Sequence, residues 1–152
     1  MHRHKDVATI LIVEDDAVLG QVLARVLTRE RQTALHVPNM SQALRLVKSR
    51  WPRLVLLDTG LRDGTALKVA ESIRALCAGL PFIFLTAYPR HKSAFPDWVD
   101  RLVTKSIDLP DLRRTVDAVL AEGRPSSESD PVETLFLPNV AGSRQDATNV
   151  NR

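Results

Sequence analysis

Several kinds of residue and segment are scarce in this chain of 152 residues, and each scarcity excludes something. Cys77 is the single cysteine, so a disulfide within the chain is impossible and a reducing compartment fits. Aromatic residues make up 5% of the sequence, too few for a platform on which single-stranded nucleic acid stacks. No segment approaches the ~20 apolar residues that cross a bilayer, and the first residues lack the apolar run of a signal peptide. We therefore expect a cytoplasmic protein that binds neither membranes nor nucleic acid.

The rest of the composition is that of a globular domain. Hydrophobic residues make up 44% and charged residues 26%, which is enough apolar material for a core. Lysine and arginine outnumber aspartate and glutamate by 21 to 18, and we interpret this small excess as a solvated surface of mixed charge. The length predicts one domain.

Five short apolar segments predict strands. Three of them are nearly unbroken aliphatic or aromatic runs, which is typical of strands buried on both faces of a parallel sheet. The expected strands are Thr9–Val13, Thr33–Val37, Arg53–Leu57, Phe82–Leu85 and Val99–Val103.

Apolar residues recur at steps of three and four between these segments, which predicts helices. The first helical stripe includes Val18 and Val22, with Asp16 as its N-cap. Only twelve residues separate Thr86 from Val99, and two of them are prolines, so we expect a shortened fourth helix there. The alternation predicts an α/β fold, a flavodoxin-like doubly wound five-stranded parallel sheet of order 2-1-3-4-5.

The ends of the chain differ from its middle. Residues 1–6 are expected to be a flexible N-terminus and residues 7–122 the folded domain. Residues 123–152 are rich in Ser, Pro, Asn and Asp without a lasting period, which predicts a disordered polar tail. We interpret both tryptophans, Trp51 and Trp98, as packing residues.

Polar residues, and in one case a small one, follow four of the five expected strands. Ligands of open α/β sheets bind outside the carboxyl ends of the strands, so these side chains should converge. They are Glu14, Asp15 and Asp16 after the first strand, Asp58 after the third, Thr86 and Ala87 at the end of the fourth, and Lys105 after the fifth. The second strand is expected to contribute nothing.

This combination predicts phosphoryl chemistry. Clustered carboxylates repel one another, and a hard cation such as Mg²⁺ relieves the repulsion. Asp58 is a candidate nucleophile, because carboxylates form aspartyl phosphates. Thr86 and Lys105 could contact a phosphoryl group, and the small Ala87 leaves room for it. Each residue alone has an ordinary structural explanation, such as a turn or a helix cap, so the prediction depends on the set.

The set resembles the receiver domain of bacterial two-component response regulators, over about residues 7–122. The matching segments are LIVEDD, LVLLDTGLRDG, FIFLTAY and LVTKS. The resemblance implies that a histidine kinase or phosphotransfer protein phosphorylates Asp58. It also implies that Mg²⁺ is held by Asp15, Asp16 and Asp58 with the backbone carbonyl of Gly60, and that Thr86 and Lys105 contact the phosphate.

Three features depart from the pattern of this family, and one of them is the shortened fourth helix. Ser106 replaces the usual proline after the lysine, so no cis peptide is expected there, and Leu102 replaces the usual aromatic switch residue. PFIFLTAY resembles the PFxFATGY signature of an alphaproteobacterial single-domain subfamily, with Leu85 and Ala87 in place of Ala and Gly. The resemblance implies a switching role for Tyr88 beside Thr86.

The function expected from these residues is that of a stand-alone response regulator that signals through a downstream protein partner of unknown identity. It would not be an enzyme, apart from slow self-dephosphorylation. One alternative is a receiver-fold adaptor that is never phosphorylated, which the three departures motivate. A second is a magnesium-dependent aspartate phosphohydrolase, although those enzymes place the nucleophile after the first strand.

Overall fold

The computed structural model describes residues 8–62, 66–87 and 95–122. The predicted flexible N-terminus and polar tail lie outside the described residues, and so does Tyr88. Within the described ranges, no helix is long and apolar enough to cross a bilayer.

One parallel sheet of five strands forms the centre of the molecule, in the order β2-β1-β3-β4-β5. The strands are β1 (Ala8–Val13), β2 (Gln32–Val37), β3 (Leu54–Asp58), β4 (Phe82–Thr86) and β5 (Arg101–Thr104). Every residue of β3 and β4 is buried, as expected for strands covered on both faces. The topology confirms the predicted flavodoxin-like fold.

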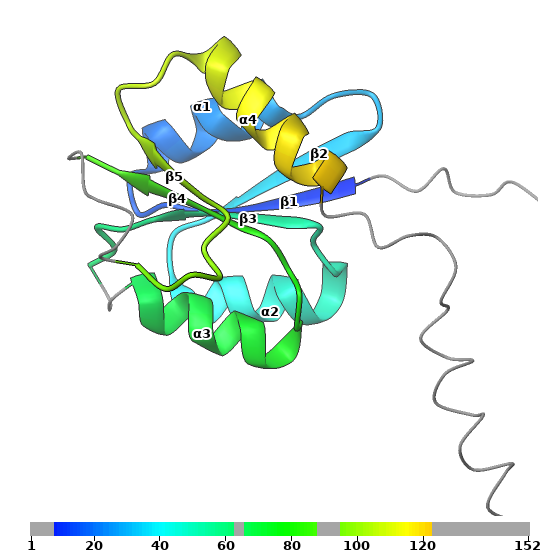
Figure 1. Ribbon diagram of the computed structural model, residues 1–152, viewed down its shortest axis with the longest axis vertical. Coiled ribbons are helices and arrows are strands. Elements are labelled where there is room, and N and C mark those ends of the chain that lie inside the picture. Colours follow the sequence, from blue (N-terminus) through cyan, green and yellow to red (C-terminus); the bar gives the residue numbers. More distant parts are fainter. Residues whose placement is uncertain (1–7, 63–65, 88–94, 123–152) are drawn as a thin grey trace, which may run out of the picture.

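The helices of the described chain cover the sheet in two layers (Figure 1), with α1 and α4 on one face and α2 and α3 on the other. They are α1 (Ala17–Leu27), α2 (Met40–Arg50), α3 (Ala66–Leu76) and α4 (Leu109–Glu122). Two apolar clusters fill the layers, and Ile12, Leu56 and Val103 belong to the one that includes residues of α1 and α4. Side chains alternate along a strand, so the residues two positions further on, Glu14, Asp58 and Lys105, are expected on the same face of the sheet as Ile12, Leu56 and Val103.

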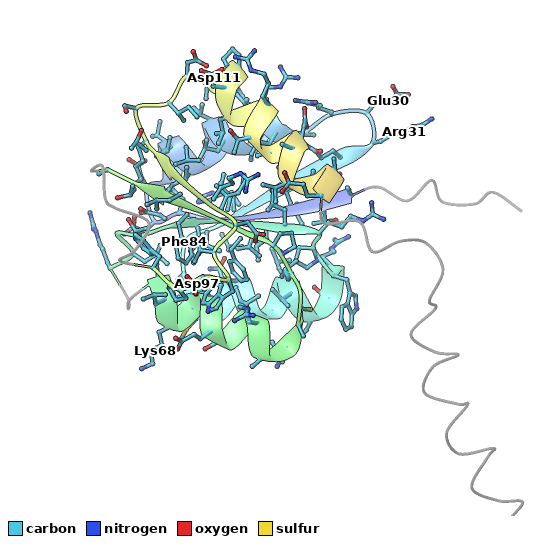
Figure 2. All side chains as sticks on the ribbon, viewed as in Figure 1. Glu30, Arg31, Lys68, Phe84, Asp97 and Asp111 are labelled. Carbon is cyan, nitrogen blue, oxygen red and sulfur yellow. The ribbon has the colours of Figure 1, made fainter. Side chains whose placement is uncertain are left out.

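The connection between β4 and β5 departs from the regular alternation, as predicted. Helix α4 follows β5, and the described part of the β4–β5 connection, residues 95–100, contains no helix. Aromatic side chains pack in this region instead. The ring of Phe84, which lies between the sheet and α3 (Figure 2), has its centroid 5.5 Å from that of Phe95 and 6.3 Å from that of Trp98. These contacts close the core beside the short connection.

Two predicted packing roles are wrong. Val18 and Val22 belong to the expected apolar stripe of α1, but their exposed fractions are 73% and 40%, because the buried residues of the helix are Gly20, Leu23 and Leu27. Trp51 is 70% exposed and ends α2 with a left-handed backbone, φ 46°. Trp98 packs against the core as predicted.

Candidate functional site

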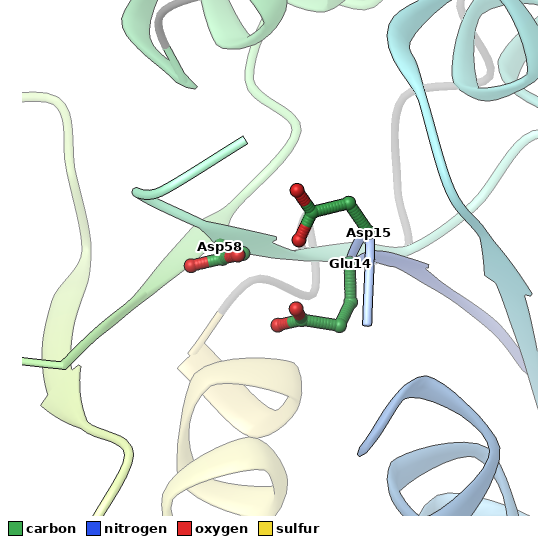
Figure 3. Close-up of side chains that lie close together, drawn as sticks. All are labelled: Glu14, Asp15 and Asp58. Atoms are coloured by element: carbon green, nitrogen blue, oxygen red, sulfur yellow. The ribbon is translucent and has the colours of Figure 1, made fainter. Parts of the chain in front are cut away.

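Three carboxylates meet at the carboxyl ends of β1 and β3. Val13 and Leu57 are paired in the sheet, so the residues that follow them, Glu14 and Asp58, leave neighbouring strands at the same level. Glu14, Asp15 and Asp58 each offer an oxygen, and these oxygens lie within 4.8 Å of one another (Figure 3). The structure thus brings together two of the predicted carboxylates, Asp15 and Asp58, and adds Glu14.

Asp16 does not belong to this cluster. Its carboxylate accepts a hydrogen bond of 3.1 Å from the amide of Leu19 and is the N-cap of α1. The sequence predicted both a cap and a metal ligand at Asp16, and the structure gives the carboxylate the first of these positions. The reason is local, because an aspartate directly before a helix satisfies an amide that has no partner within the helix.

The cation at the site comes from Lys105. Its ammonium nitrogen lies 3.1 Å from Oδ1 of Asp58 and 3.2 Å from Oε2 of Glu14. Burial by itself lowers the pKa of the lysine, but the hydrogen bonds and charges of Asp58 and Glu14 outweigh it, so the net pKa is raised. Lys105 is therefore a permanent positive charge between two acidic side chains at physiological pH.

Glu14 is the most buried acidic group of the site. Its exposed fraction is 1%, and Oε2 has no hydrogen-bond partner among the described residues apart from its ion pair with Lys105. Burial raises the pKa of Glu14 from 4.5 to about 7, opposed by a hydrogen bond from the amide of Asp16 and increased by the negative charge of Asp58. An anionic Glu14 is thus costly here and would be stabilised by additional positive charge.

Asp58 ends the central strand β3, and its side chain is nearly buried. The amide of Gly60 donates a hydrogen bond of 2.9 Å to Oδ1, the same oxygen that faces Lys105. The amide of Thr59, the residue directly after Asp58, donates a hydrogen bond to the carbonyl of Leu85 on β4. The β3–α3 turn is therefore tied both to the acidic side chain and to the neighbouring strand.

The end of β4 lies beside this cluster. Thr86 is buried, and its carbonyl accepts a hydrogen bond of 2.7 Å from the amide of Lys105. Ala87 follows in an exposed bend. These positions are compatible with the predicted phosphate contacts, which stay predictions. The peptide bond between Lys105 and Ser106 is trans, as predicted, and the half-buried Leu102 packs against the apolar cluster on the α2–α3 side.

Our prediction included Glu14 among the side chains that converge at the strand ends but did not assign it to the metal site, although a signal for that position was present. Glu14, Asp58 and Lys105 each stand two residues after an apolar residue of the same cluster, namely after Ile12, Leu56 and Val103. Side chains two residues apart on a strand lie on the same side, so this alternation places Glu14 on the side of Asp58. Asp16 has the same parity, but its carboxylate is bound by the amide of Leu19 as the N-cap of α1. Arg62 was also missed, and its amide lies 3.3 Å from Oδ2 of Asp15.

The fold and this arrangement of acids and lysine at the strand ends are those of a signalling domain of the receiver class, and the comparisons with known proteins agree. The family model described as "Response regulator receiver domain" matches residues 10–117, so the chain belongs to this family.

Similar proteins include the phosphate regulon transcriptional regulatory protein PhoB of Pseudomonas aeruginosa, 28% identical over 130 residues, which are 82% of this chain and 57% of PhoB. The swarming motility regulation protein RssB of Serratia marcescens is 34% identical over 113 residues, 72% of this chain and 52% of RssB. The chain therefore spans about half the length of these two relatives.

Among solved structures, the response regulator TrrA of Thermotoga maritima in complex with Mg²⁺-BeF has a TM-score of 0.66 and 29% identity, over 74% of this chain and 98% of that one. A CheY-like receiver domain from Methanospirillum hungatei has a TM-score of 0.70 at 23% identity, over 77% and 96% of the two chains, which shows the common fold.

The carboxylate cluster fits the Mg²⁺ ion that receiver domains bind. Its donors are all oxygens, which Mg²⁺ prefers, and two carboxylates with several waters commonly suffice for this ion. Glu14 Oε2 is buried with no hydrogen bond among the described residues, although the ammonium of Lys105 lies 3.2 Å away, so this oxygen has room for a further positive partner. The donor set, its burial and its spacing are thus compatible with a divalent cation.

Proposed function

We propose that the chain is a response regulator whose Asp58 accepts a phosphoryl group from the phosphohistidine of a histidine kinase or phosphotransfer protein. The observation that carries the proposal is the position of Asp58. Its carboxylate is nearly buried at the end of the central strand, 3.1 Å from the ammonium of Lys105 and within the cluster formed with Glu14 and Asp15. A nucleophile, a fixed cation and a site for Mg²⁺ are the parts that phosphoryl transfer needs.

In the proposed reaction, a carboxylate oxygen of Asp58 attacks phosphorus, the bond from phosphorus to the donor histidine nitrogen breaks, and that nitrogen takes up a proton. Both polar contacts that the described residues make to the Asp58 carboxylate go to Oδ1, so we assign the attack to Oδ2. Bound Mg²⁺ would neutralise negative charge on the phosphoryl oxygens. Lys105 is placed to pair with the product once Asp58 no longer holds a full negative charge.

The switching residues are a further part of the proposal. Thr86 is proposed to hydrogen-bond the phosphoryl group, and Ala87 leaves space beside it. We propose that Tyr88 responds to this contact in place of the aromatic residue that Leu102 replaces. The signal would then pass to a protein partner of unknown identity through the surface around the β4–β5 connection, in the cytoplasm. The coupling is a local change of charge that shifts a two-state equilibrium.

The test is direct phosphorylation. The purified chain is incubated with Mg²⁺ and acetyl phosphate or phosphoramidate, and its intact mass is measured. We expect a phosphate adduct that is labile to hydroxylamine, as acyl phosphates are, and that is absent without Mg²⁺. Asp58→Asn should fold normally and carry no adduct, because the amide oxygen is a poor nucleophile. An Asp58→Asn variant labelled as fast as the wild type would contradict the site.

The same experiment separates the alternatives. A wild-type chain that takes up no phosphate from either donor, although it is folded and supplied with Mg²⁺, would favour the adaptor that is never phosphorylated. Turnover of a generic phosphate ester, with repeated release of phosphate, would favour the phosphohydrolase.

A further inference from the structure

We propose that His36 of β2 is a positioning residue for the acidic site, holding the main chain from which Glu14 and Asp15 project. The proposal rests on the phosphoacceptor function of Asp58. It also changes our expectation for β2, the strand that we expected to contribute nothing to the site. His36 touches none of the reacting atoms and acts through the backbone of Glu14.

The contact is a hydrogen bond between a side chain and the main chain. Nε2 of His36 lies 2.7 Å from the carbonyl oxygen of Glu14. A carbonyl oxygen only accepts hydrogen bonds, so Nε2 carries the proton and donates it. The amide of Glu14 donates to the carbonyl of Val37 at 3.0 Å. The main-chain carbonyl and amide of Glu14 are thus bound by two consecutive residues of β2, His36 and Val37.

This contact lies at the point where the sheet ends. Val13 and Val37 are the last paired residues of β1 and β2, and the chain then turns toward α1, which begins at Ala17. Beyond the last pair, the ring of His36 binds the carbonyl of Glu14. It fixes the peptide that joins Glu14 to Asp15, so it acts on the two acidic side chains of β1 together.

The neighbouring helix makes room for the ring. Gly20 is buried in α1, and a Cβ atom built on it would lie 2.2 Å from Nε2 of His36 and 2.3 Å from Cδ2. Atoms never approach so closely, so the ring occupies the space that any side chain at position 20 would need. Glycine is among the poorest helix formers, and the packing of His36 is the reason that the structure supplies for this one.

The pair formed by Gly20 and His36 therefore connects α1 and β2 to the acidic cluster. Groups that orient the ligands of a metal site commonly change metal affinity when they are replaced, without touching the metal. His36 is placed to act in this way. Its 2.7 Å hydrogen bond binds the main chain of Glu14, and the buried carboxylate of Glu14 pairs with Lys105.

The experiment measures Mg²⁺ affinity by calorimetry and phosphorylation rate by intact mass, on the full chain with acetyl phosphate as donor. His36→Leu fills the space without a donor, and we expect it to weaken Mg²⁺ binding and slow phosphorylation by about tenfold. His36→Gln, whose amide nitrogen can donate to the same carbonyl, should recover most of both. A merely structural role would make both variants lose stability and leave affinity and rate unchanged, which would overturn the proposal.

Gln32→Ala is the matched control. Gln32 stands at the other end of β2, and its side-chain nitrogen also donates to a main-chain carbonyl, that of Leu27, at 2.6 Å. This variant should lose stability but keep Mg²⁺ affinity and rate, with all measurements made well below the thermal midpoint shown by circular dichroism. If Gln32→Ala weakened Mg²⁺ binding as much as His36→Leu, the effect would be one of general stability and the proposal would fail.

Gly20→Ala supplies an independent arm. Its methyl group should displace the ring and reproduce the losses of His36→Leu, whereas adding it to His36→Ala should cost nothing more, because the ring is gone. Additive losses would contradict the pairing. If the wild type takes no phosphate, the phosphoacceptor function fails, and the Mg²⁺ affinities of the same variants still decide the role of His36.

Discussion

Lys105, at the end of the edge strand β5, reaches Asp58 at the end of β3, although β4 lies between the two strands. The two side chains are 3.1 Å apart, so the ammonium group lies across the end of β4, where Thr86 and Ala87 stand. The lysine, which follows an edge strand, thereby balances negative charge contributed by the interior strands β1 and β3. An added phosphoryl group on Asp58 would enter the space that this side chain spans.

Loss of Lys105 should destabilise the fold at alkaline pH. Lys105→Met leaves Glu14 and Asp58 without their cation, and removing one partner of a largely buried pair costs about 1–3 kcal/mol at a partly exposed position such as this. Urea unfolding at pH 8 with a chelator measures the change. Lys48→Met, on the exposed surface of α2, is the control and should be nearly neutral. Equal free energies of unfolding for both variants would argue against the ion pair.

Glu14 should make stability fall as the pH rises. Its pKa is raised from 4.5 to about 7 in the folded chain, so between these values the folded state binds the proton and the unfolded state does not. Folding is therefore favoured at low pH, and this contribution is lost as the pH passes about 7. At 1.36 kcal/mol per pKa unit, the loss is at most about 3 kcal/mol.

Comparison with Glu14→Gln isolates this effect from other titrating groups. In chelator, the variant should match the wild type near pH 5 and be more stable near pH 8, as measured by urea unfolding at several pH values. Mg²⁺ should reduce the difference, because it favours the carboxylate. A difference that does not change with pH would show that Glu14 titrates normally in the fold.

Asp15 and Asp16 should separate into a metal ligand and a helix cap. Asp15→Asn is expected to weaken Mg²⁺ binding strongly, because one carboxylate of the cluster loses its charge. Asp16→Asn should keep both Mg²⁺ affinity and stability, since asparagine also caps helices, whereas Asp16→Ala should cost about 1 kcal/mol of stability. Calorimetry with Mg²⁺ and thermal unfolding measure the two effects. Strong loss of Mg²⁺ affinity in Asp16→Asn would restore Asp16 as a ligand.

The two tryptophans should respond oppositely to truncation. The ring centroid of Trp98 lies 5.6 Å from that of Phe82, and the guanidinium of Arg74 lies 4.3 Å from the centroid of the Trp98 ring. Trp98→Ala should therefore cost about 3 kcal/mol. Trp51→Gly should stabilise the chain by about 1 kcal/mol, because glycine adopts the positive φ of this exposed position without strain. Chemical denaturation decides both. Similar losses in the two variants would mean that Trp51 also packs.

The sequence by itself determined the sheet, its order and the residues at the strand ends. Apolar runs and helical periods are local signals, and parallel strands place their carboxyl ends on one edge whatever the details of packing. Asp58, Asp15 and Lys105 could be selected in this way. The N-cap at Asp16 was also predictable, because a cap depends on its own helix alone.

Tertiary structure decided which of the neighbouring acids faces inward. Glu14, Asp15 and Asp16 are three consecutive acids, but only Glu14 and Asp15 have oxygens close to those of Asp58, while the amide of Leu19 binds the carboxylate of Asp16. It also decided the exposure of Val18 and Trp51, and the contact of His36 with Gly20. These relationships join residues far apart in the chain, and their geometry depends on how a helix, two strands and a turn pack together. No local pattern predicts the exposure of Val18 and Trp51 or the contact of His36 with Gly20.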